Sequence, residues 1–158
     1  MFRTVSHWSL SRPLLQLILE DRTTDRFVAE RVWERLGYRP AADQSPAGLW
    51  NAGPDTPDAW RTAFPQGPEV IATRPASVAL TRSVPKPLKQ LLKEQMGFGG
   101  YKIGELYPRR TRRATAVNWL LAWLAERGEP LAVDGPCPVP LDPPRDPVAG
   151  HPGDLPVS

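Results

Sequence analysis

Apolar residues recur at the three- and four-residue spacing of an α-helix in four separate stretches of this chain. Ser11 precedes the first stretch and can cap a helix, Thr23 or Thr24 can start the second, and Gly37 suits the end of the second. The pattern predicts helices over residues 12–20, 24–36, 87–96 and 109–127. We therefore expect a mainly α protein, built as a small single-domain helical bundle with long loops.

The last of these helices is apolar on almost every side. Within residues 114–125, only Thr115 and Asn118 interrupt the apolar residues. A helix without a polar face is normally surrounded by other elements. This helix is therefore expected to lie at the centre of the bundle, with large side chains such as Leu120 and Trp123 largely buried.

Residues 38–76 show no clear periodicity and are rich in proline, glycine and alanine. Thr56-Pro57-Asp58 is a good helix start, so a short helix is predicted to about residue 64. Aromatic residues recur at intervals through this segment: Tyr38, Trp50, Trp60 and Phe64. A long loop inside a compact domain either packs by its own side chains or carries function, and we favour packing here.

The segment at 77–84 lies between prolines and alternates weakly between apolar and polar residues. Such alternation favours an extended segment over a turn of helix. Because no partner strand is evident, the fold is expected to hold at most a minimal extended segment near 77–84.

Proline is distributed unevenly along the chain. The sequence holds 20 prolines, and nine of them fall within residues 129–158. This segment has few large apolar residues and neither helical nor strand periodicity, which is typical of disordered or polyproline-rich chain. We predict a helical domain over residues 8–128 and a disordered, proline-rich acidic tail over residues 129–158.

Charge is also distributed unevenly, although the formal net charge is only +3. Residues 74–113 hold ten basic and two acidic residues, whereas residues 129–158 hold one basic and five acidic residues. Three of the lysines recur at helical spacing on a face separate from the apolar one. The candidate residues for binding an anion or a partner are Lys86, Lys89, Lys93, Lys102, Arg109, Arg110, Arg112 and Arg113.

The four arginines fall within five residues at the start of the last predicted helix. The N-terminal end of a helix dipole is positive, so each exposed cation there costs roughly 0.3–1 kcal/mol. Helix stability alone would favour Asp or Glu at these positions. The arginines therefore indicate either an anionic partner or carboxylates elsewhere in the fold.

Three interpretations of the basic region remain open. The region could track the phosphates of a nucleic acid, RNA in particular, with Tyr101 or Tyr107 stacking on bases. It could instead form a docking face for an acidic protein partner, as in a regulatory adaptor. In the third interpretation the arginines form ion pairs inside the fold. The candidate acidic partners are Glu20, Asp21, Glu30 and Glu34. We expect a non-enzymatic binding protein, with nucleic acid placed ahead of an acidic protein.

An enzyme is the third alternative, because the sequence shows no catalytic constellation. His7 and His151 lie at opposite ends of the chain, and Cys137 has no neighbour in sequence that would activate it. The glycines at 97–100 lack the Gly-Lys-Ser/Thr ending of a phosphate-binding loop. We therefore predict no catalytic, cofactor-binding or metal-binding residues.

A cytoplasmic location is expected from three features of the sequence. Cys137 is the only cysteine, so no disulfide can form within the chain, which fits a reducing compartment. The first residues lack the apolar core of a signal peptide. No apolar run approaches the roughly 20 residues of a membrane span.

Four stretches carry a family resemblance: Leu80–Pro85, Lys89–Phe98, Gly100–Glu105 and Pro108–Leu121. Together they resemble an uncharacterised domain family of unknown function from cyanobacteria and chloroplast-bearing organisms. The resemblance covers roughly residues 10–127 and leaves the tail outside. It implies a cytosolic protein of cyanobacterial origin, and it brings no activity with it.

Overall fold

The computed structural model describes residues 8–41 and 48–158, so His7 lies outside the described residues. Within them the chain forms six α-helices, two single turns of 3-10 helix and one two-stranded sheet. The mainly α fold class predicted from the periodicity is confirmed. No helix in these ranges is both long enough and apolar enough to cross a membrane.

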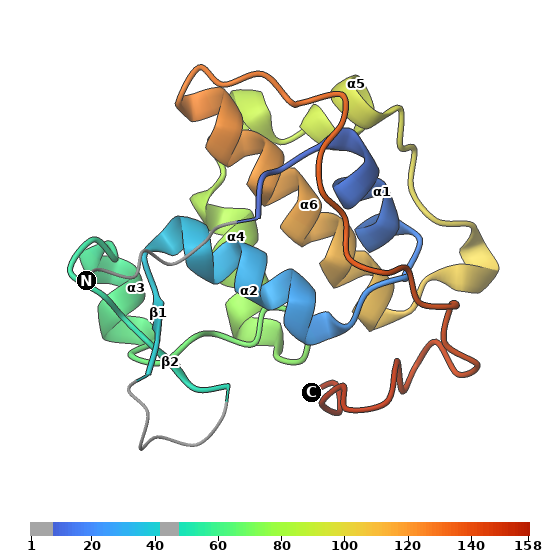
Figure 1. Ribbon diagram of the computed structural model, residues 1–158, viewed down its shortest axis with the longest axis horizontal. Helices are drawn as coiled ribbons and strands as arrows, with labels where there is room; N and C mark the ends of the chain where they lie inside the picture. The colour runs from blue at the N-terminus through green and yellow to red at the C-terminus, as the bar shows by residue number, and fades with distance from the viewer. Residues whose placement is uncertain (1–7, 42–47) are drawn as a thin grey trace.

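The longest helix, α6 (Pro108–Glu126), runs through the middle of the molecule (Figure 1). Four other helices pack against it: α1 (Arg12–Leu19), α2 (Asp25–Leu36), α4 (Arg74–Ser83) and α5 (Leu91–Met96). This arrangement follows from the composition of α6, because its residues 114–125 have little polar surface to face water.

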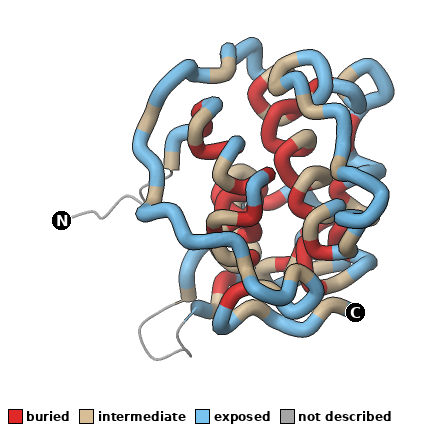
Figure 2. Tube along the Cα trace, turned by 90° about the vertical axis from the view of Figure 1, so that its right-hand side faces the viewer, coloured by how far each residue is buried: buried red, intermediate tan, exposed pale blue. Residues whose placement is uncertain are grey.

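Burial is greatest where these helices face α6. Ala116, Val117, Leu120 and Leu121 of α6 have no exposed surface, and the buried stretches of the chain gather in the interior of the bundle (Figure 2). The prediction of a central, buried last helix is therefore confirmed. Trp123 is the exception among its large residues, because it is only partly buried.

The two N-terminal helices begin at the caps that the sequence offers. The Ser11 hydroxyl accepts a hydrogen bond from the backbone N–H of Leu14 at 3.3 Å, and the Thr24 hydroxyl accepts one from Phe27 at 3.1 Å. Each bond satisfies an amide that has no partner inside the helix. Gly37 ends α2 in the left-handed conformation, with a φ of 84°.

The expected extended segment near 77–84 is wrong, since residues 74–83 form α4. Pro75 lies in the first turn of this helix, where proline is well tolerated. Ala76 and Leu80, four residues apart, are both fully buried, and α4 packs on α6. The packing of this face onto α6 outweighed the weak alternation of the segment.

The single sheet of the described chain pairs β1 (Arg39–Pro40) with antiparallel β2 (Trp50–Asn51) in the segment 38–76. The predicted short helix there is α3 (Asp58–Ala63).

The aromatic residues of this segment pack inward, as predicted. Tyr38, Trp50 and Trp60 are buried, and the Tyr38 hydroxyl donates to the Phe64 carbonyl at 2.6 Å. Residues 42–47 of the loop lie outside the described residues.

The predicted helix over 87–96 is shorter than expected. A 3-10 turn, η1 (Lys86–Leu88), comes first, and α5 begins only at Leu91. Pro87 has no N–H to donate, which weakens a continuous helix at this point. The three lysines at 86, 89 and 93 therefore do not share one unbroken helical face.

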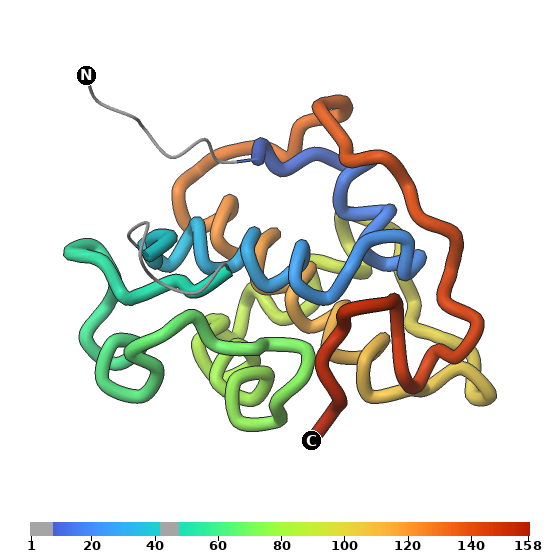
Figure 3. Tube along the Cα trace, turned by 60° about the horizontal axis from the view of Figure 1, so that its bottom comes forward, coloured from blue at the N-terminus to red at the C-terminus, as the bar shows by residue number. Residues whose placement is uncertain are grey.

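The chain after α6 has no regular secondary structure and runs around the α1 side of the bundle (Figures 1 and 3). The division into a domain over 8–128 and a disordered tail over 129–158 stays a prediction. The contacts of this segment with the helices are described below.

Candidate anion-binding site

The arginines at the start of α6 do not form an exposed surface. Arg109 and Arg113 have no exposed side-chain area. Arg109 contacts Asp21 through Nη1–Oδ2 and Nη2–Oδ1, both at 3.0 Å. It also contacts Asp25 through Nε–Oδ2 at 2.9 Å and Nη2–Oδ1 at 2.7 Å. Its guanidinium thus meets two carboxylates with two bonds each, which is the strongest geometry available to this group.

Arg113 lies one turn further along α6 and completes the same cluster. Its Nη1 donates to Asp25 Oδ1 at 2.8 Å, its Nε to the Ile18 carbonyl at 2.9 Å, and its Nη2 to the Thr23 hydroxyl at 2.6 Å. Asp21 itself has a φ of 60°, a left-handed conformation that is uncommon outside glycine. The two arginines therefore hold the turn between α1 and α2 against α6.

Charge compensation explains how the cluster tolerates burial. Burial alone would raise the pKa of Asp21, but the hydrogen bond from Arg109 and the charges of Arg113, Arg109 and His151 hold that pKa below its ordinary value. Burial alone would lower the pKa of Arg109, but its bonds to Asp21 and Asp25 raise the pKa above the usual value. Both partners remain ionised, as a buried ion pair requires.

The internal-pairing interpretation thus fits Arg109 and Arg113. Of their two carboxylate partners, Asp21 was one of the four acids predicted from the sequence, and Asp25 was not. Among the other acids offered, Glu34 pairs with Arg31 and Arg35.

The other two arginines of the cluster are also engaged. Arg110 Nη1 lies 3.4 Å from Glu105 Oε2, its Nε lies 3.5 Å from Asp21 Oδ2, and its side chain is 14% exposed. Arg112 donates from Nη1 to the carbonyls of Ile71 and Ala72, at 2.9 and 3.2 Å. Arg109 and Arg113 therefore offer no free positive charge to a partner, whereas Arg110 and Arg112 stay partly exposed.

The lysines have the opposite surroundings. Lys86, Lys89, Lys93 and Lys102 are all exposed, and none of the four forms an ion pair with any residue in 8–41 or 48–158. Lys102 lies on the connector before η2 (Ile103–Glu105). Lys89 and Lys93 come together at a groove.

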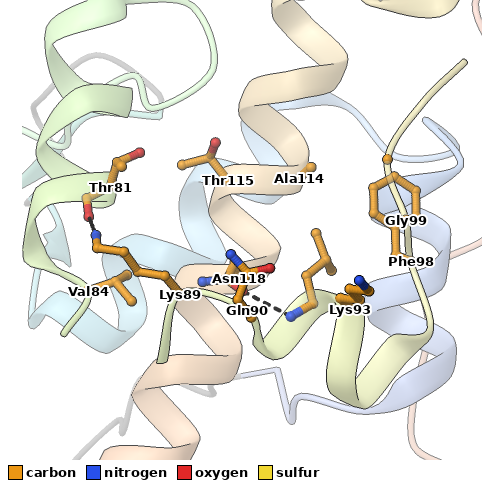
Figure 4. A pocket seen from close by; sticks show the side chains of 12 residues that line it. Thr81, Val84, Lys89, Gln90, Lys93, Phe98, Gly99, Ala114, Thr115 and Asn118 are labelled. Atoms are coloured by element: carbon orange, nitrogen blue, oxygen red, sulfur yellow. Dashed lines mark hydrogen bonds between the residues drawn. The ribbon is translucent and has the colours of Figure 1, made fainter. Parts of the chain in front are cut away.

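This groove has a volume of about 470 Å³ and lies between α4, α5, α6 and the connector that follows α5 (Figure 4). None of the described residues that line it is acidic. The lining residues are Thr81, Val84, Lys89, Gln90, Leu92, Lys93, Phe98, Gly99, Gly100, Ala114, Thr115 and Asn118.

Hydrogen bonds fix the floor of the groove. The Asn118 side chain accepts from the Leu92 N–H at 2.9 Å and donates to the Leu88 carbonyl at 3.2 Å. These bonds join the start of α5 to α6. On one side, Lys89 Nζ donates to the Thr81 carbonyl in the last turn of α4 at 2.7 Å (Figure 4). A cation is favourable at this end of a helix.

An aromatic pair supports the other side of the groove. Phe98 meets Tyr101 edge to face, with ring centroids 5.0 Å apart. The Tyr101 hydroxyl donates to the Leu19 carbonyl at 2.8 Å, which ties the connector to α1. Burial raises the pKa of Tyr101 to about 12, so its hydroxyl keeps its proton near neutral pH. Phe98 is thereby held across the groove from Lys89 (Figure 4).

The structure thus brings two of the eight predicted residues, Lys89 and Lys93, to one groove. Gln90, Thr115 and Asn118 also line the groove, and none of them was predicted as a site residue. A signal was present for two of these, because Thr115 and Asn118 are the polar interruptions in an otherwise apolar helix.

Comparisons with known proteins agree on the domain and give no activity. A family model described as "Domain of unknown function (DUF1823)" matches residues 9–125. A solved structure described as "Solution NMR structure of the protein" is similar, with 44% sequence identity and a TM-score of 0.63. The similarity covers 82% of this chain and 100% of that one. No curated protein matches.

Proposed function

The chain belongs to this family of unknown function, and we propose that it is a non-enzymatic binding protein whose groove between α4, α5 and α6 binds single-stranded nucleic acid, RNA in particular. One observation carries the proposal: Lys89 and Lys93 line a groove that has no acidic residue among the described residues forming it. Phosphate groups are the anions that such a lysine pair attracts in a nucleic acid.

The groove supplies the two kinds of contact that unspecific single-strand binding uses. Lys89 donates one hydrogen bond to Thr81, and an ammonium group has two further donors for a phosphate. Lys93 is exposed beside it. Phe98 offers a ring across the groove from Lys89, and a base stacked on an aromatic ring gains about 1–3 kcal/mol.

An acidic protein segment is the second candidate, and the composition of the groove wall favours it. Val84, Leu92, Phe98 and Ala114 give the wall an apolar surface that could hold an apolar anchor residue, while the lysines contact neighbouring carboxylates. The engagement of Arg109–Arg113 also leaves fewer cations for an extended phosphate backbone than the sequence suggested.

The salt dependence of RNA binding tests the nucleic-acid candidate against no binding at all. The test is fluorescence anisotropy of a labelled mixed-sequence single-stranded RNA at several salt concentrations. The slope of log affinity against log salt should be about −0.7 for each phosphate neutralised. Lys89→Gln with Lys93→Gln should therefore flatten the slope by about 1.4.

The matched control is Arg39→Gln with Arg145→Gln, which removes the same charge from exposed positions that do not line the groove. This control should keep the wild-type slope. The absence of RNA binding at low salt would exclude the nucleic-acid proposal. Capture of an acidic protein that depends on Lys89 and Lys93 would then favour the second candidate.

A cytoplasmic location and a cyanobacterial origin stay predictions from the sequence. They are supported by the single cysteine, Cys137, and by the resemblance of residues 10–127.

A further inference from the structure

The segment 141–158 is tied to the helical domain at both of its ends. Arg22 and Leu141 exchange two hydrogen bonds of 3.0 Å, one through the Leu141 N–H and one through the Arg22 Nε. At the other end, the Ser158 N–H donates to the Ala72 carbonyl at 2.8 Å. Figure 3 shows this last part of the chain, in red, turning back beside the helices before it reaches the C-terminus.

Between these ends, Asp154 lies in a site formed by the helical domain. Its side chain is 1% exposed. Its Oδ1 accepts from the backbone N–H of Asp25 at 2.9 Å, and its Oδ2 accepts from Arg109 Nη2 at 3.2 Å. Asp25 is the first residue of α2, so its N–H has no partner inside the helix. The site therefore provides one carboxylate with a free amide donor and with a guanidinium N–H that it shares with Asp21 or Asp25.

The turn around Asp154 fits this site closely. The Arg109 Nη1 donates to the Pro147 carbonyl at 3.0 Å. His151 is buried, with its Nε2 2.8 Å from the Asp21 carbonyl. Gly150 has a φ of +87°, and a Cβ atom there would lie 2.5 Å from Arg109 Nε. Only glycine allows the backbone to lie this close to the guanidinium.

The helical domain does not need Asp154 to balance its charges. Arg109 and Arg113 already face two carboxylates, Asp21 and Asp25. Burial raises the pKa of Asp154, and the nearby carboxylate of Asp25 adds to that rise. The family match ends at residue 125, before this segment begins. The contact is therefore an addition to a cluster that is complete on its own.

We infer that residues 141–158 are a detachable intramolecular ligand, whose turn at 147–154 binds through the Asp154 carboxylate to a site made by Arg109 and the Asp25 amide. This partner surface is separate from the groove at Lys89 and Lys93. It also differs from a disordered tail, because the segment has a defined docking position. It differs from a core element as well, because the segment can leave without unfolding the helices.

Amide hydrogen exchange of the full chain tests this inference. The Leu141 and Ser158 amides report docking, because each donates to the helical domain rather than to Asp154. The Leu120 amide of α6 reports the core. A hydrogen bond to a charged group stabilises the docked segment. Asp154→Asn removes that charge and should therefore speed exchange at Leu141 and Ser158 roughly ten- to a hundredfold. Exchange at Leu120 should not change.

Two further variants make the test specific. Asp142→Asn removes the same charge from an exposed position in the same segment and should leave all three amides unchanged. Gly150→Val should release the segment as Asp154→Asn does, without altering any charge. Exchange of Leu141 and Ser158 at free-peptide rates in the wild type would overturn the inference. Unchanged exchange in both release variants, or faster exchange at Leu120, would also overturn it.

Discussion

The arginines at the start of α6 and the lysines before and within α5 carry the same charge in opposite surroundings. Arg109 and Arg113 are fully buried against Asp21 and Asp25, whereas Lys89 and Lys93 are exposed at a groove without acidic lining. Two of the four arginines in the densest run of positive charge are thus used inside the fold. The sparser set remains available to a partner.

The chemistry of the two side chains accounts for this division. A guanidinium is weakly hydrated and has five donors in a rigid fork, so it can meet two carboxylates inside a protein. An ammonium is a strongly hydrated point charge, which favours the surface. A cluster of arginines beside a buried helix therefore indicates internal pairing as readily as it indicates a ligand.

The largest expected effect comes from removing Arg109. Arg109→Gln would leave Asp21 and Asp25 buried with too little positive charge, and breaking such a pair typically costs about 3–5 kcal/mol. Chemical denaturation measures the loss of unfolding free energy. Arg82→Gln, at an exposed arginine of α4, is the control and should change stability by less than about 0.5 kcal/mol. A loss below about 1 kcal/mol for Arg109→Gln would break the contrast between the two regions.

A smaller loss is expected for Arg109→Lys, which keeps the charge and removes the fork. Lysine cannot reproduce the paired bonds to Asp21 and Asp25, so about 1–3 kcal/mol should be lost. The reverse exchange, Lys89→Arg, should be nearly neutral because Lys89 is exposed. Thermal melts of the two variants would compare the loss of stability at the two positions. Equal stability would show that the geometry of the buried pair is unimportant.

Lowering the pH should reduce the stability that the arginine cluster contributes and should leave the contribution of the lysines unchanged. The folded protein holds the pKa of Asp21 below its ordinary value of 3.8. The contribution of Asp21 to stability is therefore present above the unfolded pKa and is lost as the pH falls through the folded pKa. Unfolding free energies measured from pH 5 downwards should show this loss. Asp21→Asn should flatten the dependence, and an unchanged curve would contradict the role of Asp21.

The smallest effect on stability is expected at the groove. Lys89→Gln loses one hydrogen bond to the end of α4, and a cation at that position contributes about 0.3–1 kcal/mol. Lys93→Gln should change stability by less than about 0.5 kcal/mol. Denaturation midpoints of the two single variants would test this order. A large loss at either lysine would mean that the groove cations are structural as well.

The sequence predicted α1, α2 and α6 because their caps and apolar faces are local features. It failed at α4, where the packing of Ala76 and Leu80 on α6 decided the conformation. It also named only one of the two internal partners of Arg109, Asp21, and missed Asp25. Asp25 lies 84 residues before Arg109, and no spacing rule connects a turn between two early helices with the start of the last one.

The groove was predictable only in part, for the same reason. The lysines were evident as a basic stripe, and Thr115 and Asn118 stood out within an apolar helix. Their meeting at one groove depends on the break between η1 and α5 and on the bonds from Asn118 that hold α5 to α6. Only the packed structure brings these elements together.

The most direct test of the proposed groove is to map where an anionic strand binds. Backbone amide shifts would be recorded while a short single-stranded RNA is titrated into the full chain at low salt. The expected result is a set of shifts at residues that line the groove, such as Lys89, Lys93 and Thr115, with none at Asp21 or Arg109. Shifts centred on Arg109–Arg113, or no shifts at any amide, would contradict the account.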